Sequence, residues 1–462
     1  MNRLLGVSEH LRWLVDQRWS FNFALCARVR GAISVQQLTD ALAWVQHRHP
    51  LLGVRIATED SQQPRFVSEG VPHIPLRVVK RQGDEHWCQE AEAELSLPFL
   101  GSKGPLLRVV FLQNEVISEL IITCHHSLGD GLSVIYLIRD ILQEISTPGS
   151  RSEILPELPS WEELIPLSQG SISANAIAQV TPTQKITKSN AGVVLNHASD
   201  KGVWSNPVGV QGDKGTLEGF SSLPTTYDHP RDKEAIEASS RSSILYWCLS
   251  PEETAKLVSR CREKQASVQS ALCAAFLLSI AHQMNWSEDT SHPCLSPCNV
   301  RKYLVPEIGE DFGLYICSLL SSHILKPETS FWELAQEVKH QIKEWTAGKL
   351  FEDIPKSTAF LSTQPDPQTV YQQMDEKIKL VITNLGRLNI PQEYGSLSLE
   401  AIYGPTAQGT ENAKTVGVMT LGGKMFLTLT FSESVLPRSI AEKIQTEAMQ
   451  RISEALGSET HT

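Results

Sequence analysis

The feature that most restricts the fold of this chain is a short polar segment between two apolar runs. Residues 117–124 are rich in β-branched side chains and favour a strand, whereas Ile135, Ile138 and Leu142 recur on one face of a helix. The seven residues 125–131 between them read HHSLGDG. Apolar flanks predict that the strand lies inside the protein, where polar side chains at its end need partners. The segment therefore predicts an α/β fold with a sharp internal turn.

The two adjacent histidines of this turn cannot share one role. Side chains alternate along a strand, so His125 and His126 point to opposite faces, and one is a candidate for chemistry while the other is structural. Gly129 and Gly131 allow a tight turn and a close approach of backbone. The following helix directs its free N–H groups and positive end toward the turn. A neutral imidazole placed there could accept a proton from a hydroxyl or an amine.

Two other interpretations of this segment remain open. The histidines and Asp130 could bind a metal, but the histidines diverge and no third ligand is evident. A strand-end histidine can also be purely structural. Cys294 and Cys298, with His292 nearby, would need a second ligand pair to form a zinc site. The nine cysteines are scattered, and several lie in apolar runs typical of buried thiols, so we expect no metal.

Size and charge exclude several classes of protein. A chain of 462 residues is long enough for about two to three domains. The net charge of −11 argues against a nucleic-acid-binding protein and against broad attachment to anionic lipid. Charged residues interrupt the first 17 positions, so no secretory segment is visible. The apolar stretch 271–281 is far shorter than the roughly 20 residues of a membrane span. We therefore expect a cytoplasmic protein without a membrane span.

The chain divides into two structured halves around a polar segment. Ser34 and Gln37 form a capping-box signature for a helix that Pro50 stops. Residues 169–243 are rich in small and polar side chains, and we interpret them as a partly flexible crossover linker; a folded insertion is the alternative. We expect an N-terminal lobe of residues 1–168 and a C-terminal lobe of residues 244–462. Further elements are expected at residues 106–112 (strand), 250 onward (helix), 268–284 (helix), 315–324, 380–382 and 424–431 (strands) and 439–456 (helix).

The HHSLGDG segment resembles the H-H-x-x-x-D-G motif of a large acyltransferase superfamily. Its members include chloramphenicol acetyltransferase, the condensation domains of nonribosomal peptide synthetases, plant BAHD acyltransferases and alcohol acyltransferases. Weaker matches follow in the family's order at residues 48–52 (RHPLL), 155–156 (LP), 164–166 (LIP), 299–301 (NVR) and 384–387 (NLGR). The resemblance covers nearly the whole chain outside the linker. It is nearest to the polyketide-associated and alcohol acyltransferase branch.

One further match departs from its family pattern. Residues 311–313 read DFG and resemble the D-F-G-W-G segment of plant BAHD enzymes, but Leu314 and Tyr315 differ from it. We therefore interpret residues 311–313 as a structural turn.

The resemblance implies two chloramphenicol-acetyltransferase-like lobes, each a two-layer α/β sandwich, with an active-site tunnel between them. By position in the motif, His126 is the general base. Asp130 is structural and pairs with an arginine of the other lobe, for which Arg301 is the best match. The remaining expected site residues are His125, which orients the turn, Gly131, which keeps it small, and Ser127 and Asn384, which are candidates for lining the tunnel.

The predicted function is acyl transfer from a thioester to a hydroxyl, forming an ester. The donor would be an acyl-CoA or a phosphopantetheine thioester on an acyl-carrier protein, with no bound cofactor and no metal. The acceptor would be a small alcohol or amine, and a monomer is the default expectation. Two alternatives stay open. One is a condensation-type enzyme that forms an amide or uses a carrier-bound acyl chain. The other is a relative that only binds a ligand.

Overall fold

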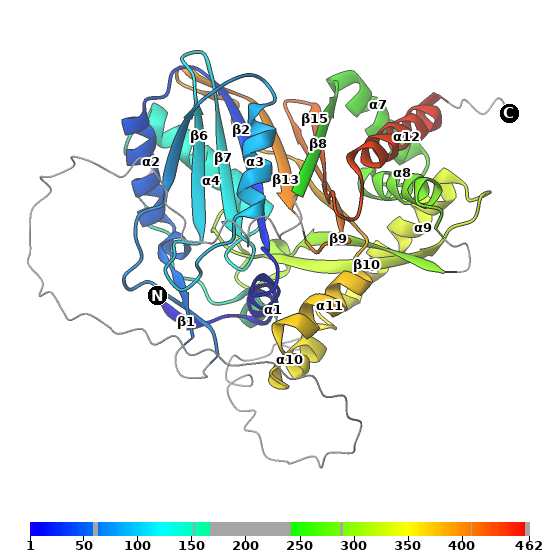
Figure 1. Ribbon diagram of the computed structural model, residues 1–462, viewed down its shortest axis with the longest axis horizontal. Coiled ribbons are helices and arrows are strands. Elements are labelled where there is room, and N and C mark those ends of the chain that lie inside the picture. The colour runs from blue at the N-terminus through cyan, green and yellow to red at the C-terminus, as the bar shows by residue number, and fades with distance from the viewer. Residues whose placement is uncertain (59–62, 151–152, 167–241, 287–289, 408, 458–462) are drawn as a thin grey trace, which may run out of the picture.

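The structure, a computed structural model, describes residues 1–58, 63–150, 153–166, 242–286, 290–407 and 409–457. These residues form two lobes side by side, each built on a six-stranded sheet with helices packed on it (Figure 1). The expectation of a mixed α/β fold with two sheet-and-helix lobes is confirmed.

The sheet of the first lobe has the strand order β12-β13-β2-β7-β6-β5. Its central strands β2 and β7 are buried on both faces, which suits a sheet covered by other elements. A separate three-stranded sheet, β1-β4-β3, lies beside it. The bounds in this lobe are β1 Asn2–Leu4, α1 Val7–Asp16, β2 Asn22–Arg30, α2 Val35–Arg48, β3 Arg55–Ala57, β4 Arg65–Val67, β5 Leu76–Lys80, α3 His86–Ser96, β6 Leu107–Gln113, β7 Ile117–His125 and α4 Gly131–Ser146.

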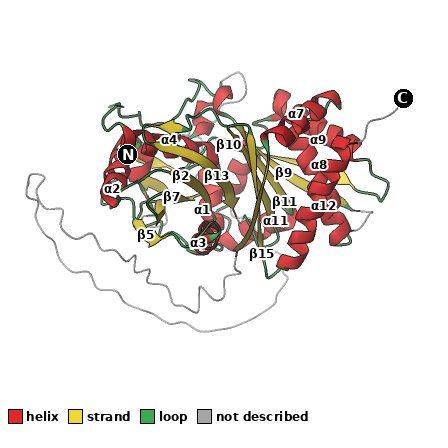
Figure 2. Ribbon diagram, turned by 90° about the horizontal axis from the view of Figure 1, so that it is seen from above, coloured by secondary structure: helices red, strands yellow, loops and turns green. Residues whose placement is uncertain are grey.

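The sheet of the second lobe has the order β10-β9-β11-β14-β15-β8. Figure 2 shows the helices α7, α8, α9 and α12 gathered on the outer side of this sheet. The bounds are β8 Ser242–Leu249, α7 Pro251–Glu263, α8 Val268–Gln283, β9 Ser291–Asn299, β10 Ile316–Ile324, α9 Phe331–Glu344, α10 Ile354–Ser362, α11 Pro367–Lys377, β11 Leu380–Arg387, β12 Glu393–Tyr394, β13 Leu397–Ala407, β14 Lys414–Leu421, β15 Lys424–Ser432 and α12 Arg438–Gly457.

The strand β13 crosses from the second half of the chain into the sheet of the first lobe. It pairs antiparallel with β2, where Tyr403 lies opposite Cys26. It also lies against β14 and β15 of the other sheet. The close approach needs a glycine, because a Cβ on Gly417 would lie 2.3 Å from the carbonyl oxygen of Pro405. The C-terminal range 244–462 therefore supplies β12 and β13 to the first lobe.

The predicted linker 169–243 lies outside the described residues except at its end. Its last two residues, Ser242 and Ser243, begin β8, which pairs along its whole length with β15. The division of the chain into 1–168, 169–243 and 244–462 stays a prediction.

The helix starts that capping residues predict are present in the structure. Ser34 caps α2, and its side chain accepts a hydrogen bond from the Gln37 amide at 3.1 Å. Ser250 caps α7 in the same way, accepting from the Glu253 amide at 3.2 Å. The apolar segment 271–281 lies inside α8 and is buried almost throughout, as expected for a core helix.

No single helix of the described residues is long and apolar enough to cross a membrane. Only α7 and α8 taken together pass that test, and they are bent by 96° at the break between them.

The RHPLL segment, residues 48–52, connects the end of α2 to α4 by hydrogen bonds and an ion pair. Arg48 donates from its Nε to Asp140 Oδ2 at 3.2 Å, and His49 Nε2 lies 3.1 Å from the same oxygen. Both partners are buried, so the carboxylate of Asp140 is satisfied by groups from the neighbouring helix. This segment therefore supports the helix that follows the HHSLGDG turn.

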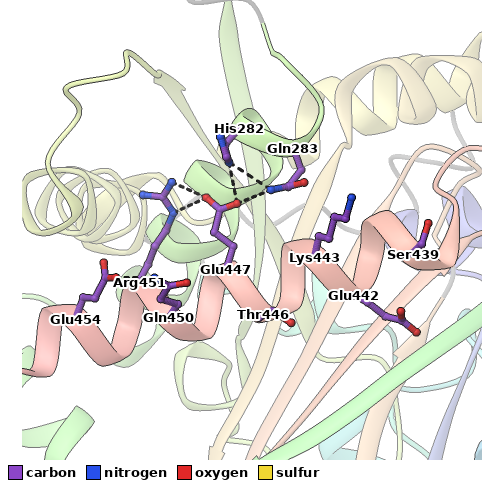
Figure 3. Close-up of a pocket in the computed structure, with 10 residues that line it drawn as sticks. All are labelled: His282, Gln283, Ser439, Glu442, Lys443, Thr446, Glu447, Gln450, Arg451 and Glu454. Carbon is purple, nitrogen blue, oxygen red and sulfur yellow. Dashed lines mark hydrogen bonds and ion pairs between the residues drawn. The ribbon is translucent and has the colours of Figure 1, made fainter.

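A polar cluster joins α8 to α12 on the outer face of the second lobe. Glu447 of α12 points toward the end of α8, where its Oε2 lies 2.9 Å from His282 Nδ1 and accepts from Gln283 Nε2 at 2.8 Å (Figure 3). Its other oxygen accepts from Arg451 at 2.6 Å. These residues line an open depression of about 740 Å³, in which the carboxylate of Glu447 is already paired.

Candidate active site

The backbone of the HHSLGDG turn is anchored to the strands on both sides of β7. The amide of His125 donates to Leu106 O at 2.9 Å, and the amide of His126 donates to Phe21 O at 3.0 Å. As strand alternation predicts, the two histidine side chains meet different surroundings. His125 lies in the interior, whereas His126 lines a cavity.

The imidazole of His126 is held in a defined orientation. Its Nδ1 lies 3.3 Å from the carbonyl oxygen of Gly129. A carbonyl can only accept, so this contact is a hydrogen bond when Nδ1 carries the proton, which leaves Nε2 as the basic nitrogen. Phe21 stacks on the ring at 5.2 Å between centroids, and Phe23 lies at 5.0 Å in a tilted arrangement. The ring is therefore fixed against an apolar wall.

The surroundings of His126 keep it neutral. Burial lowers the pKa of His126 to about 3, and the positive charge of Arg12 acts in the same direction. A neutral imidazole can accept a proton at ordinary pH without first losing one. The same low pKa makes His126 a weak base. It can therefore take the proton of the acceptor only as the acceptor forms its new bond to the acyl group.

His125 is enclosed and serves the turn. Its Nδ1 accepts a hydrogen bond from the amide of Ser127 at 3.1 Å, and its Nε2 lies 3.2 Å from Asp16 Oδ2. Asp16 in turn accepts from the amide of Phe21 at 2.9 Å. His125 thus ties the turn to the end of α1 and to the segment that places Phe21 against His126.

Ser127 does not line the cavity, in contrast to the prediction. It is fully buried, and its hydroxyl donates to the carbonyl oxygen of Glu9 at 2.9 Å. The turn after His126 directs this side chain toward α1. Asn384 does line the cavity, and its Oδ1 accepts from the amide of Gly386 at 2.8 Å.

Asp130 and Arg301 form a buried, two-pronged ion pair between the lobes. Arg301 Nη1 donates to Asp130 Oδ2 at 3.0 Å, and Nη2 donates to Oδ1 at 3.1 Å. Asp130 also caps α4 by accepting from the amide of Ser133 at 2.9 Å, and it accepts from the amide of Tyr315 at 2.8 Å. The carboxylate therefore joins β7, α4 and the start of β10 at one point.

The DFG segment supports the turn from the second lobe. The carbonyl oxygen of Gly313 accepts from the amide of Asp130 at 3.2 Å and from the hydroxyl of Ser133 at 2.7 Å. The ring of Phe312 packs against Gly129, where a Cβ would lie 2.7 Å from it. The interpretation of residues 311–313 as a structural turn agrees with these contacts.

Gly131 provides room rather than an unusual backbone conformation. A Cβ at this position would lie 2.9 Å from Pro405 and 3.1 Å from a methyl group of Leu385. Those two residues come from β13 and β11, so the start of α4 meets both at short range. Any larger residue would push α4 away from them.

A cavity of about 500 Å³ lies between the lobes with His126 on its wall. Its lining combines α1, the start of β2, the HHSLGDG turn, β9, β10, α10, α11, β11, β13 and β14. Most of the lining is apolar, which suits a substrate with an aliphatic part. Asp130, Gly131, Arg301 and Asn384 also border it, so the structure brings most of the predicted site residues to one place.

Several residues of this cavity carry no motif in the sequence. Phe21 and Phe23 come from the chain just before and inside β2, and Pro405 comes from the distant strand β13. Arg12 lies on α1 one turn before the fully buried Val15. A charged residue at the edge of the apolar face of a helix is the one sequence signal that could have marked Arg12 as a cavity residue.

Cys294, Cys298 and His292, which were considered as zinc ligands, pack against other side chains. Cys294 is fully buried, with its sulfur 3.5 Å from that of Cys273. Cys298 lies opposite Cys317 in the β9–β10 pair, and His292 stacks on Trp286 at 4.3 Å. In the part of the chain that the structure describes, no group of three His, Cys, Asp or Glu residues could hold a metal ion.

The neutral histidines predict that acid destabilises the fold. Burial lowers the pKa of His10 to about 4 and that of His126 to about 3, both from 6.5. Between these values and 6.5 the unfolded chain binds more protons than the folded one, so stability falls as pH falls. The urea midpoint should decrease from about pH 7 to about pH 5, and His10→Asn should reduce that decrease. A urea midpoint that is constant between pH 7 and pH 5 would contradict the lowered pKa values of His10 and His126. Glu162, whose pKa is raised by burial, acts in the opposite direction.

Comparison with known proteins shows that the chain is similar to acyltransferases and condensation domains. A family model described as "Condensation domain" matches residues 11–156, and one described as "Phthiocerol/phthiodiolone dimycocerosyl transferase C-terminus" matches residues 239–432. The phthiocerol/phthiodiolone dimycocerosyl transferase of Mycobacterium tuberculosis (strain ATCC 25618 / H37Rv) is 21% identical over 348 residues, covering 74% of each chain. A component of the linear gramicidin synthase of Brevibacillus parabrevis is 24% identical over 76% of this chain, which spans only 6% of that protein.

Solved structures of the same fold cover the whole chain. Trichothecene 15-O-acetyltransferase from Fusarium sporotrichioides has a TM-score of 0.66 at 11% identity, over 98% of this chain and 95% of that one. Polyketide synthase associated protein 5 from Mycobacterium tuberculosis has a TM-score of 0.61 at 15% identity, over 98% of this chain and 100% of that one. The resemblance found in the sequence is thereby confirmed.

Proposed function

We propose that this relative of condensation domains and of the dimycocerosyl transferases is an acyltransferase that moves an acyl group from a thioester to a hydroxyl. The observation that carries the proposal is the neutral imidazole of His126, which is held by Gly129 and faces an apolar cavity between two lobes. Direct transfer between two bound substrates requires a base, a cavity that excludes water and enough room for both substrates.

The proposed reaction needs no covalent enzyme intermediate. The acceptor hydroxyl gives its proton to Nε2 of His126 while its oxygen attacks the carbonyl carbon of the thioester. The C–S bond then breaks, and the leaving thiolate takes the proton back from His126. Asp130 and Arg301 hold the turn in place and do not exchange protons with substrate. The donor is an acyl-CoA or a phosphopantetheine thioester on a carrier protein.

Amide formation is the second candidate. It is favoured by the condensation-domain match over residues 11–156, which includes the whole HHSLGDG segment. The first condensation domain of the calcium-dependent antibiotic synthetase also superposes with a TM-score of 0.64 at 13% identity, over 100% of this chain and 98% of that one. An amine in place of the hydroxyl would use the same base. The acyl donor would then be carried by a carrier protein.

Acceptor-dependent release of free thiol is the test. Acyl-CoAs from acetyl to palmitoyl, and the same acyl groups on a carrier protein, are incubated with the protein and with a mixture of alcohols or amines. We expect thiol release that rises when an alcohol is added, with an ester identified by mass spectrometry. An amide product would select the second candidate. No release from either kind of donor would favour a relative that only binds its ligand.

A further inference from the structure

Arg12 is a positive charge on the cavity wall, and no carboxylate of the described residues pairs with it. Its side chain borders the cavity together with His126. Within the described parts of the chain, its Nη1 donates to the backbone carbonyl of Ser8 at 3.0 Å, and its buried Nε has no hydrogen-bond partner. Among the described residues no carboxylate lies within ion-pairing distance of the guanidinium. The side chain is half-buried and its Nε is shielded from water, and a desolvated cation without a counter-charge is unfavourable, so the resting cavity is poised to take up a negative charge.

The carboxylates that attract Arg12, which are Glu162, Asp130 and Glu9, are engaged with other groups, Asp130 with Arg301. Glu9 receives two hydrogen bonds from Arg3, each at 2.7 Å, and one from the amide of Gly6 at 2.7 Å. Glu162 accepts from the amide of Ser8 at 2.7 Å, and burial raises its pKa, so its charged form is disfavoured. These carboxylates attract Arg12 without pairing with it, and burial lowers the pKa of the guanidinium despite them.

The charge of the cavity is opposite to that of the whole chain. The chain carries a net charge of −11, whereas the charged residues that line the cavity are Arg12, Arg301, Lys377 and Asp130. Asp130 is neutralised by Arg301, which leaves Arg12, half-buried on the cavity wall, and Lys377, exposed at the end of α11. A positive, largely apolar cavity in an acidic protein concentrates a ligand that is both aliphatic and anionic.

We propose that Arg12 binds a carboxylate of the substrate inside the cavity, so that one of the two reacting molecules is an aliphatic carboxylic acid derivative. The inference rests on the proposed function, because it names the substrate class of the same site. The carboxylate belongs either to an acyl donor with a terminal carboxyl group or to a hydroxy acid acceptor. A guanidinium suits this role because its planar N–H groups match a carboxylate with two parallel hydrogen bonds.

The competing role for Arg12 is stabilisation of the oxyanion formed during transfer. An oxyanion exists only during the reaction, so it would leave the guanidinium without a partner in every resting complex. A substrate carboxylate would pair with it on binding. The two roles therefore differ in binding measured without turnover.

Calorimetric titration with octanoate and with 1-octanol separates these roles without any assay of activity. The variants are Arg12→Met, which keeps an unbranched apolar stem and removes the charge, and Arg18→Met, which removes the same charge from an exposed site just beyond α1. We expect octanoate to bind the parent and Arg18→Met more tightly than 1-octanol does. Arg12→Met should weaken octanoate about 10- to 100-fold and leave 1-octanol nearly unchanged. Thermal unfolding should show that Arg12→Met is folded.

Octanoate that binds the parent no better than 1-octanol, or that binds Arg12→Met as well as the parent, would overturn the proposal. Turnover then identifies which substrate carries the carboxylate. Adipoyl-CoA is compared with hexanoyl-CoA on a neutral alcohol, and ω-hydroxyhexanoate with 1-hexanol on hexanoyl-CoA. Arg12→Met should remove the preference for the charged member of one pair. An equal loss of turnover on all substrates would assign Arg12 to the oxyanion instead.

A failure of the proposed function would look different. The protein would then release no thiol with any pair, while the calorimetric preference for octanoate and its loss in Arg12→Met would remain. Binding therefore decides the role of Arg12 independently of whether the chain catalyses acyl transfer.

Discussion

Replacing His126 by alanine should lower turnover by about 10²–10⁴-fold while the protein stays folded, because the reaction loses its general base. Among the described residues the lost ring makes one weak hydrogen bond, to Gly129 O at 3.3 Å, and packs on Phe21 and Phe23, so its removal should cost some stability without unfolding the protein. The measurement is the rate of acceptor-dependent thiol release at saturating donor. Far-ultraviolet circular dichroism and the unfolding temperature report the fold.

A matched control is His340→Ala on α9. The side chain of His340 is 71% exposed and pairs only with Glu344 on the surface, so its loss should leave turnover unchanged. Full activity in His126→Ala would show that another group removes the proton. The same loss in both variants would indicate a general effect on the preparation rather than on the site.

Replacing Asp130 by alanine should destabilise the protein by about 3–5 kcal/mol, because it leaves the buried guanidinium of Arg301 without its partner. The substitution also removes the cap of α4 and the acceptor for the amide of Tyr315. Urea unfolding monitored by tryptophan fluorescence measures the loss. Turnover should fall as well, since the turn that carries His126 is held by the same carboxylate.

The double variant Asp130→Ala with Arg301→Met separates the ion pair from the cap. Removing both charges should recover part of the stability lost in Asp130→Ala, because no unpaired charge then remains buried. The unrecovered part contains the hydrogen bonds that Asp130 accepts from the amides of Ser133 and Tyr315 and those that Arg301 donates to Ser133 and Asn299. If Asp130→Ala is as stable as the parent, Asp130 does not have the structural role that its contacts suggest.

The parts of the site that the sequence could predict are local. The strand, turn and helix around HHSLGDG follow from side-chain periodicity within about thirty residues, and alternation along the strand separates His125 from His126. Ser34 and Ser250 mark helix starts because a cap depends only on the next three residues. The pairing of Asp130 with Arg301 spans 171 positions and was expected only through the family resemblance.

The parts that could not be predicted depend on contacts between distant segments. Phe21, Arg12 and Pro405 reach the cavity because α1, β2 and β13 are brought there by the tertiary fold, and none lies in a recognisable motif. Ser127 was expected at the cavity because it follows His126, but its orientation depends on where α1 packs. Nothing local in residues 397–407 indicates that β13 joins the sheet of the first lobe, because that choice depends on its pairing with β2.

The crossing of β13 also constrains the order in which the polypeptide can fold as it is synthesised. The hydroxyl of Thr406 donates to the carbonyl oxygen of Ala24, which lies 382 positions earlier. When residues 1–146 have left the ribosome, β2 has β7 on one side and an open edge on the other. An open edge invites pairing with other chains until its partner emerges. The nascent chain must therefore keep this edge protected through most of translation, and the cavity cannot close before β13 and the residues that follow it arrive.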